Sequence, residues 1–137
     1  MALTHLVDTS VLTRLQRPEV RLVLEPLAAS GQVARAGISD LEIGYSARTP
    51  TEWDSFQRAL SAFHLVETDA DHVRRARQVQ RLLAARSQRG RKIPDLLIAA
   101  AAEAAGLTVL HYDSDFDRIS TVTGQACQWV VPAGSID

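Results

Sequence analysis

The stretch that decides the fold runs from residue 93 to residue 113 and reads Ile93-Pro-Asp-Leu-Leu-Ile-Ala-Ala-Ala-Ala-Glu-Ala-Ala-Gly-Leu-Thr-Val-Leu-His-Tyr-Asp113. Pro94 suits the first turn of a helix and Gly106 suits its end, so a helix is predicted over residues 95–105. Because this helix is apolar nearly all round, we expect it to be central and buried. The apolar run 107–110 that follows predicts a buried strand.

Short apolar runs alternate with longer helical patterns along the rest of the chain, with no linker or repeat between them. The predicted strands cover residues 3–7, 32–36, 65–66, 107–110 and 128–131. The predicted helices cover residues 11–16, 18–28, 39–47, 50–63, 69–87, 95–105 and 113–119. Thr68 would cap the 69–87 helix and Gly90 would end it. This alternation predicts an α/β fold, with a central, mainly parallel sheet flanked by helices, in a single domain over residues 1–137.

Length and composition narrow the class of protein. A chain of 137 residues has the size of one domain, and 46% hydrophobic with 23% charged residues is ordinary globular composition. The formal net charge of −1 excludes a polycation or an acidic tail protein. The single cysteine excludes an internal disulfide and a cysteine-based zinc site. There is no membrane-length apolar run or leader-like start, so we expect a cytoplasmic protein without a membrane partner.

Acidic residues stand where a parallel sheet is expected to bind its ligand. Asp8 directly follows the first predicted strand, and Asp113 with Asp115 follows a later one. Glu42 and Asp95 lie in the first turns of two predicted helices. Because ligands of such sheets bind beyond the carboxyl ends of the strands, we expect these acids to share one rim.

Asp95 indicates the chemistry of that rim. A carboxylate at the head of an apolar helix is costly to bury, and the helix dipole offsets only ~0.3–1 kcal/mol. Clustered carboxylates repel one another unless a cation joins them, and oxygen-only ligands suit Mg²⁺ or Mn²⁺. Two such ions ~3.5–4 Å apart can activate water and stabilise a phosphodiester's leaving oxygen. The sequence therefore suggests metal-dependent phosphodiester hydrolysis.

Each acid also has a plainer interpretation. Asp8 fits a helix N-cap, and Glu42 fits the acid of a capping box with Ser39. The turn 113–117 fits a group of solvated acids, and Asp95 fits a partner of the helix dipole. These interpretations are individually good but jointly weaker, because all four places fall at the same end of the predicted sheet.

Four segments, in order and over nearly the whole chain, resemble PIN-domain ribonucleases, and specifically the VapC-type toxins of bacterial type II toxin–antitoxin pairs. The segments are Leu6-Val7-Asp8-Thr9-Ser10-Val11-Leu12, Leu41-Glu42-Ile43-Gly44, Asp95-Leu96-Leu97-Ile98-Ala99-Ala100-Ala101 and Asp113-Ser114-Asp115-Phe116-Asp117-Arg118-Ile119. The resemblance implies a PIN-like three-layer fold. It also implies an endoribonuclease that hydrolyses RNA with Mg²⁺ or Mn²⁺.

Site residues carry over from the resemblance by position. The quartet expected to catalyse cleavage and to bind the metal is Asp8, Glu42, Asp95 and Asp113. Asp115 would be a further metal ligand, acting through a water, and Thr9 and Ser10 would support the site by hydrogen bonding. The resemblance also implies a cognate antitoxin that blocks the acidic groove, and a homodimer.

One position departs from the family pattern. The family usually has Thr or Ser two residues before the acid equated with Asp113, and here that residue is His111. We interpret His111 as a strand-end residue that faces a neighbour or solvent and is neutral at pH 7. The alternative is a hydrogen-bond donor to a scissile phosphate or to Asp113.

Basic residues gather just before the buried helix. Eight of them and no acid occur from Arg74 to Lys92. Such a run is usually a solvated face, but it can also hold an RNA backbone or an acidic antitoxin segment. We assign RNA binding to the residues that lead into Asp95, namely Arg86, Arg89, Arg91 and Lys92.

Other function classes remain for comparison. An aspartyl-phosphate phosphatase needs a second Asp two residues after Asp8, where this chain has Ser10. A receiver domain needs a lysine after a late strand, but Lys92, the only lysine, precedes the buried helix. A nuclease-dead binding module would not need the acids, and a housekeeping RNA-processing nuclease stays open.

Overall fold

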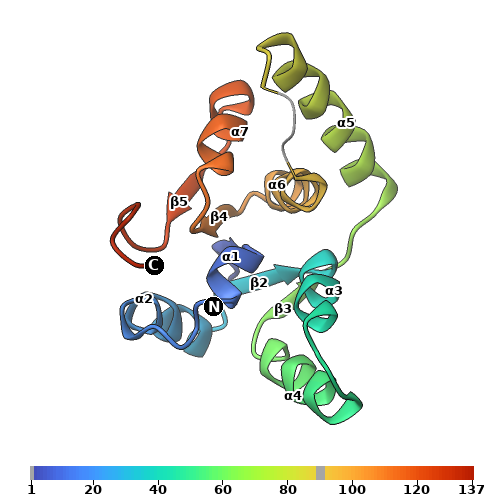
Figure 1. Ribbon diagram of the computed structural model, residues 1–137. Helices are drawn as coiled ribbons and strands as arrows, with labels where there is room; N and C mark the ends of the chain where they lie inside the picture. Colours follow the sequence, from blue (N-terminus) through green and yellow to red (C-terminus); the bar gives the residue numbers. More distant parts are fainter. Residues whose placement is uncertain (1, 89–91) are drawn as a thin grey trace.

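The computed structural model describes residues 2–88 and 92–137 and is built on a five-stranded sheet (Figure 1). The strands are β1 (His5–Val7), β2 (Val33–Ala36), β3 (His64–Val66), β4 (Thr108–His111) and β5 (Cys127–Trp129). They lie in the order β3-β2-β1-β4-β5, and every neighbouring pair is parallel. The predicted α/β fold is confirmed, and the described sheet is parallel throughout.

Helices cover both faces of this sheet. They are α1 (Thr9–Leu12), α2 (Pro18–Ala29), α3 (Gly37–Tyr45), α4 (Pro50–Leu60), α5 (Ala70–Ala85), α6 (Ile93–Ala105) and α7 (Asp115–Thr123). Figure 1 shows α5, α6 and α7 on one side of the sheet and α2 and α4 on the other. The result is the three-layer arrangement that the sequence predicts.

Each face of the sheet buries its own hydrophobic core. Leu6 and Val109 pack with residues of α5, α6 and α7, whereas Val7 and Leu110 pack with residues of α2 and α4. Adjacent residues of one strand enter different cores because successive strand side chains point to opposite faces. All four of these side chains are fully buried, so the sheet is covered on both sides.

The predicted buried helix is confirmed as α6. Its side chains from Leu96 to Ala102, apart from a partly buried Leu97, are buried between the sheet and the outer helices. Pro94 occupies the first turn, and Gly106 ends the helix in the left-handed conformation, with φ of 68°. These are the start and stop signals read from the sequence. The helix therefore presents Asp95, in its first turn, to one end of the sheet.

Two predicted helix starts near the site are wrong. The first helix begins at Thr9 rather than residue 11, because the Asp8 side chain caps it there. The third helix begins at Gly37, so Ser39 is not its cap and Glu42 lies in its second turn. Ser39 is instead buried and bonds Thr9, so tertiary contact overrides the capping-box pattern.

A third predicted start, that of α5, is wrong by one residue. The cap is Asp69 rather than Thr68: its side chain accepts a hydrogen bond from the His72 N–H, and the His72 ring accepts one from the Asp69 N–H. This reciprocal pair satisfies two amides that the helix leaves without partners. The predicted helix end at Gly90 lies outside the described residues.

No helix in residues 2–88 and 92–137 is long and apolar enough to cross a membrane.

Candidate active site

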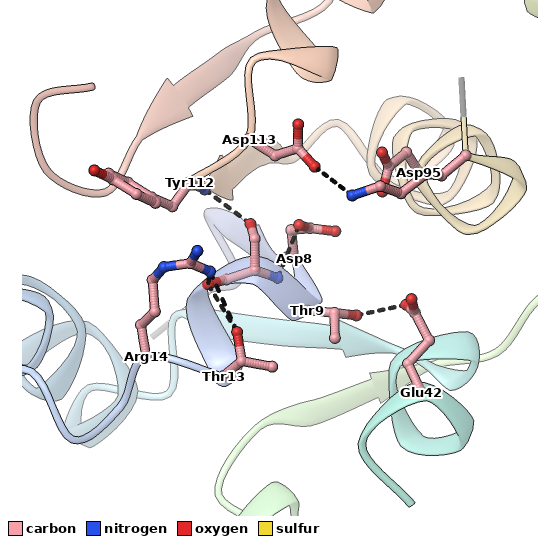
Figure 2. Close-up of a pocket in the computed structure, with 10 residues that line it drawn as sticks. Asp8, Thr9, Thr13, Arg14, Glu42, Asp95, Tyr112 and Asp113 are labelled. Carbon is pink, nitrogen blue, oxygen red and sulfur yellow. Dashed lines mark hydrogen bonds and ion pairs between the residues drawn. The ribbon is translucent and has the colours of Figure 1, made fainter. Parts of the chain in front are cut away.

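The site lies where the strand order reverses, between β1 and β4. Asp8 follows β1 and its N–H donates to the Leu110 carbonyl of β4, 2.9 Å away. In open parallel sheets this is where a crevice forms and ligands bind. A cavity of about 230 Å³ opens there (Figure 2). Its lining residues are Asp8, Thr9, Ser10, Thr13, Arg14, Glu42, Lys92, Asp95, Tyr112 and Asp113.

Asp8 is both a helix cap and a cavity residue. Its Oδ2 accepts the Ser10 N–H at 2.9 Å, as the plainer interpretation of this residue expects. Its Oδ1 is buried without a hydrogen-bond partner among the described residues. Burial raises the pKa of Asp8, the Ser10 hydrogen bonds oppose that effect, and the charges of Glu42 and Asp113 add to it. One oxygen thus caps α1, and the other is free of hydrogen bonds from the described residues.

Thr9 fixes the position of Glu42. The Thr9 hydroxyl donates to Glu42 Oε1 at 2.7 Å, and Ser39 Oγ lies 2.8 Å from the same hydroxyl. Because Thr9 has one hydroxyl proton, Ser39 donates to Thr9. These two hydrogen bonds link α1 to α3 and hold the Glu42 carboxylate at the edge of the cavity (Figure 2). Thr9 therefore hydrogen-bonds to one of the acids that the sequence analysis places at the site.

Ser10 supports the site from the other side of α1. Its Oγ accepts the Tyr112 N–H at 2.9 Å, which ties α1 to the end of β4. The Tyr112 hydroxyl donates to the Ile136 carbonyl at 2.6 Å, and so holds the last residues of the chain against the same region. Ser10 therefore couples the acid after β1 to the segment that carries Asp113.

Asp95 is the most perturbed acid of the site. Its side chain is buried, with 5% exposure, and Oδ2 has no hydrogen-bond partner among the described residues. Burial raises the pKa of Asp95 to about 8, with further contributions from the charges of Asp8 and Asp113. The Lys92 charge acts in the opposite direction without cancelling the shift. A second cationic partner is needed to keep this carboxylate ionised at neutral pH.

Asp113 is held ionised by its neighbours. Its Oδ1 accepts the Asp115 N–H at 2.9 Å, and its Oδ2 lies 3.1 Å from Lys92 Nζ. Burial acts to raise the pKa of Asp113, but the Asp115 hydrogen bond and the Lys92 contact outweigh it and lower that pKa. Asp115 begins α7 and pairs with Arg118 at 3.5 Å.

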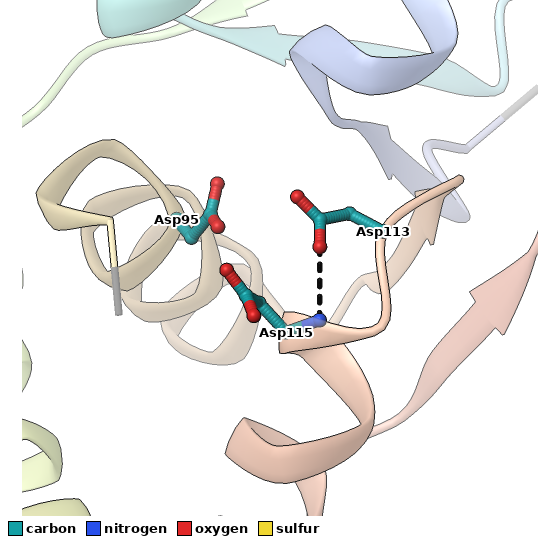
Figure 3. A group of neighbouring side chains, drawn as sticks. All are labelled: Asp95, Asp113 and Asp115. Atoms are coloured by element: carbon teal, nitrogen blue, oxygen red, sulfur yellow. Dashed lines mark hydrogen bonds between the residues drawn. The ribbon is translucent and has the colours of Figure 1, made fainter. Parts of the chain in front are cut away.

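Three of the acids meet at metal-binding distances. Ligand oxygens of Asp95, Asp113 and Asp115 all lie within 4.8 Å of one another (Figure 3). Asp8 and Glu42 line the same cavity but do not belong to this group. The buried unpartnered oxygens of Asp8 and Asp95, together with an all-carboxylate donor set, fit a hard divalent cation.

His111 is not at the surface, as one interpretation allowed, but fully buried against neighbours. Its ring lies 4.9 Å from that of Phe116 and 5.0 Å from that of Trp129. Burial lowers the pKa of His111 to about 4, although the charges of Asp117 and Asp113 oppose the change. Its Nδ1 accepts the Asp113 N–H at 3.2 Å, so the neutral ring orients Asp113 as an acceptor rather than a donor.

Of the four basic residues predicted to bind RNA, the structure describes two, and one of these lines the cavity. Lys92 lines the cavity beside Asp113, whereas Arg86 caps the end of α5 and is exposed. Arg89 and Arg91 lie outside the described residues. Arg75, within the same basic run, forms a two-point ion pair with Glu103 of α6, and so joins two helices.

Three cavity residues escaped the sequence analysis: Thr13, Arg14 and Tyr112. Arg14 comes four residues after Ser10, and its Nη1 donates to the Ser10 carbonyl at 2.7 Å. That spacing, one helical turn beyond Ser10, was a signal for a shared face. Tyr112 carried no such signal, because its ring contacts the Arg14 guanidinium from a distant part of the sequence.

Comparison with known proteins agrees with this geometry. Residues 5–122 match the family model described as PIN domain. A relative from Mycobacterium tuberculosis, "Ribonuclease VapC51", is 68% identical over 137 residues, which is the full length of both chains. "Ribonuclease VapC21" of the same species is 42% identical, and the match covers 98% of this chain and 99% of that protein.

Solved structures resemble the fold. A DNA-bound VapBC from Salmonella typhimurium superimposes with a TM-score of 0.77 at 17% identity, covering 94% of this chain and 99% of the other. VapBC2 from Rickettsia felis, bound to a fragment of its promoter, has a TM-score of 0.77 at 19% identity and the same coverage. The parallel sheet, the acids at its switch point, the family model and the close relatives agree: this chain belongs to the PIN-domain family.

Proposed function

We propose that the protein is a metal-dependent endoribonuclease and the toxin component of a type II toxin–antitoxin pair. One observation carries the proposal: Asp8 and Asp95 each keep a buried carboxylate oxygen without a partner in the described structure, beside one cavity. Such buried acids are costly unless they bind a cation. The relatives named as ribonucleases support RNA as the substrate of that cation-dependent chemistry.

We assign the metal-binding role to Asp8, Asp95 and Asp113, with Asp115 joining them through a water. Mg²⁺ or Mn²⁺ suits these oxygen ligands. When bound, the cation lowers the pKa of a water and polarises a phosphodiester oxygen. Asp113 stays ionised through its contacts with Lys92 and Asp115, so it offers a charged ligand at neutral pH.

Glu42 has a different role in this proposal. Its Oε1 is already held by Thr9, whereas Asp8 keeps a buried oxygen without a partner among the described residues. The other Glu42 oxygen, Oε2, remains as an acceptor for a water at the cavity edge, which it can orient toward a phosphate. Thr9 and Ser10 act as positioning residues, because their hydrogen bonds fix α1 against α3 and β4.

RNA and antitoxin would meet the protein on surfaces beside this cavity. We assign the RNA backbone to Lys92 with Arg86, Arg89 and Arg91, which precede α6 in the chain. An apolar groove is lined by Ile38, Leu41, Leu65 and Leu97, among others, and α3 contributes Leu41 to this groove and Glu42 to the cavity. An antitoxin segment could place apolar side chains in this groove and a basic side chain against the cavity acids. Such a segment would block the cavity.

The homodimer and the cellular location are parts of the same proposal. We base the homodimer on the resemblance to VapC-type toxins, in which dimers are common. Size-exclusion chromatography with light scattering should give twice the 15.0 kDa chain mass. Since RNA is the proposed substrate, we place the activity in the cytoplasm.

The deciding experiment is RNA cleavage by purified Asp8→Asn and Asp95→Asn variants, with Mg²⁺, with Mn²⁺ and with EDTA. We expect both variants to lose activity by about 10²-fold or more while remaining folded, because each removes a cation ligand. Asp71→Asn, at an exposed acid of α5 that pairs with Arg74, is the matched control and should cleave normally.

Two results would count against the proposal. Retained cleavage by a folded Asp8→Asn, Asp95→Asn double variant would refute metal-dependent catalysis at these acids. Calorimetric titration that detects no Mg²⁺ or Mn²⁺ binding would favour a nuclease-dead module instead. A housekeeping nuclease differs from a toxin in cells: only the toxin should arrest growth on expression and be relieved by the protein encoded beside it.

A further inference from the structure

Arg14 is a cavity residue that the quartet of acids does not explain. It lies just beyond α1, two residues after that helix ends, and its side chain is 25% exposed. The cavity that it lines also contains Asp8, Asp95 and Asp113. Figure 2 shows its guanidinium to the left of Asp8, with Asp95 to the right and Asp113 above. A strand of RNA that crosses the acids would therefore pass this side chain.

Four contacts hold the guanidinium of Arg14 in place. Nη1 donates to the Ser10 carbonyl at 2.7 Å and to Thr13 Oγ1 at 3.3 Å, and Nε donates to Asp137 Oδ2 at 3.2 Å. The guanidinium carbon also lies 4.9 Å from the centre of the Tyr112 ring, a distance at which a cation is attracted to an aromatic face. Nη2 has no hydrogen bond to the described residues. The guanidinium is thus oriented by its neighbours, and the two N–H groups of Nη2 stay available to a ligand.

The charge around the cavity requires such a cation. Lys92, the other cation in the lining, is engaged by the cavity acid Asp113. Among the described residues, Arg14 forms its ion pair with Asp137, which is not in the cavity lining. Phosphates that flank a cleaved bond would meet the repulsion of the acids that bind the metal. The unbonded Nη2 of Arg14 can donate charge-assisted hydrogen bonds to phosphate oxygens, and the positive charge of the guanidinium offsets that repulsion where it stands.

We propose that Arg14 binds a backbone phosphate of the RNA next to the one that is cleaved. This inference rests on the proposed function, since it names a further substrate contact of the same cavity. Arg14 and Lys92, which both line the cavity, would then both contact the strand. Tyr112 and Asp137 are positioning residues, because they act on the phosphate only through the guanidinium.

The test measures how salt weakens RNA binding. Each variant is made in the Asp8→Asn background, so that a fluorescent single-stranded RNA cleaved by the wild type is bound without being cut. For single strands, log K falls with log salt by ~0.7 for each phosphate neutralised. We expect Arg14→Gln to weaken binding about tenfold at moderate salt and to reduce this slope by ~0.7.

Matched variants separate phosphate binding from a structural role. Arg17 also pairs with Asp137, at 3.5 Å, but does not line the cavity, so Arg17→Gln should leave the slope unchanged. Asp137→Asn removes the anchor and not the cation, so the slope should again be unchanged. Arg14→Lys keeps the charge but loses the fork; it should keep the slope while binding more weakly. This variant also serves if Arg14→Gln does not fold.

The outcomes distinguish the two proposals. If the wild type cleaves RNA but Arg14→Gln keeps the parental slope, the Arg14 assignment is overturned and the nuclease assignment stands. Equal slope losses in Arg14→Gln and Arg17→Gln would show a general charge effect, and would also overturn it. If the wild type neither cleaves nor binds RNA, the proposed function itself fails, and the Arg14 assignment fails with it.

Discussion

Replacing Asp95 with Asn should stabilise the metal-free protein at neutral pH, and the gain should grow with pH. The pKa of Asp95 is raised from 3.8 to about 8 in the folded chain. Between those values the folded state keeps a proton that the unfolded state has lost, so the stability of the wild type falls as pH rises. Asn carries no titrating proton, and therefore the variant escapes this loss.

The magnitude follows from the size of that interval. Each pH unit is worth about 1.4 kcal/mol, so at pH 7 the wild type should have lost ~4 kcal/mol relative to acid conditions. The Asn amide must itself be buried at a position with 5% exposure, where an unsatisfied polar group costs ~1–3 kcal/mol. We therefore expect a net gain of ~2 kcal/mol at pH 7, a net loss of ~1–2 kcal/mol near pH 4 and a plateau above pH 8.

Urea denaturation in EDTA at several pH values measures this gain, with Asp71→Asn as the control because that acid is exposed. Adding Mg²⁺ should reverse the order of stability. At a hundred times its dissociation constant the ion stabilises the wild type by ~2.7 kcal/mol, whereas the variant has lost a ligand. A gain that does not depend on pH, or a variant less stable than the wild type at pH 8 in EDTA, would refute the reasoning.

Three further predictions concern other parts of the chain. Thr9→Val should lower the cleavage rate about tenfold because it frees Glu42 from a 2.7 Å hydrogen bond, whereas Thr9→Ser should not; a steady-state cleavage assay decides. Burial raises the pKa of Cys127 to about 11, so at pH 8 its thiol should react with a disulfide reagent ~100-fold more slowly in the folded than in the urea-unfolded protein. Leu83→Ala should lower the free energy of unfolding in urea by ~3 kcal/mol, because Leu83 is 2% exposed. Leu82→Ala, at a 38% exposed position, should lower it by less than ~1 kcal/mol. Equal losses would contradict the packing described.

Elements with a strong local signal were predictable from the sequence. The helix from Pro94 to Gly106 is apolar nearly all round and has standard start and stop residues, so its identity and burial followed directly. Asp8 and Asp113 follow short apolar strands, and in a parallel sheet the strand ends converge at one edge. Local pattern and topology rules were therefore enough to bring these acids to one site.

Helix starts near the site were less predictable because side chains there have tertiary partners. Ser39 and Glu42 have capping-box spacing, yet both are engaged by Thr9, and α3 begins two residues before Ser39. His111 could be expected to be neutral, but its burial between two aromatic rings required the fold. A capping motif competes with long-range hydrogen bonds, and one sequence does not rank the two.

The sequence by itself determined the fold class, the acidic set and its fitness for a hard cation, because strand alternation, helix signals and carboxylate chemistry are local properties. Only the tertiary structure decided how the acids divide. It brought Asp95, Asp113 and Asp115 within 4.8 Å of one another, held Glu42 apart on Thr9, and turned Arg14 toward the cavity. Those distances depend on strand order and helix packing, which join segments up to a hundred residues apart, as the 2.9 Å contact from Tyr112 N–H to Ser10 illustrates.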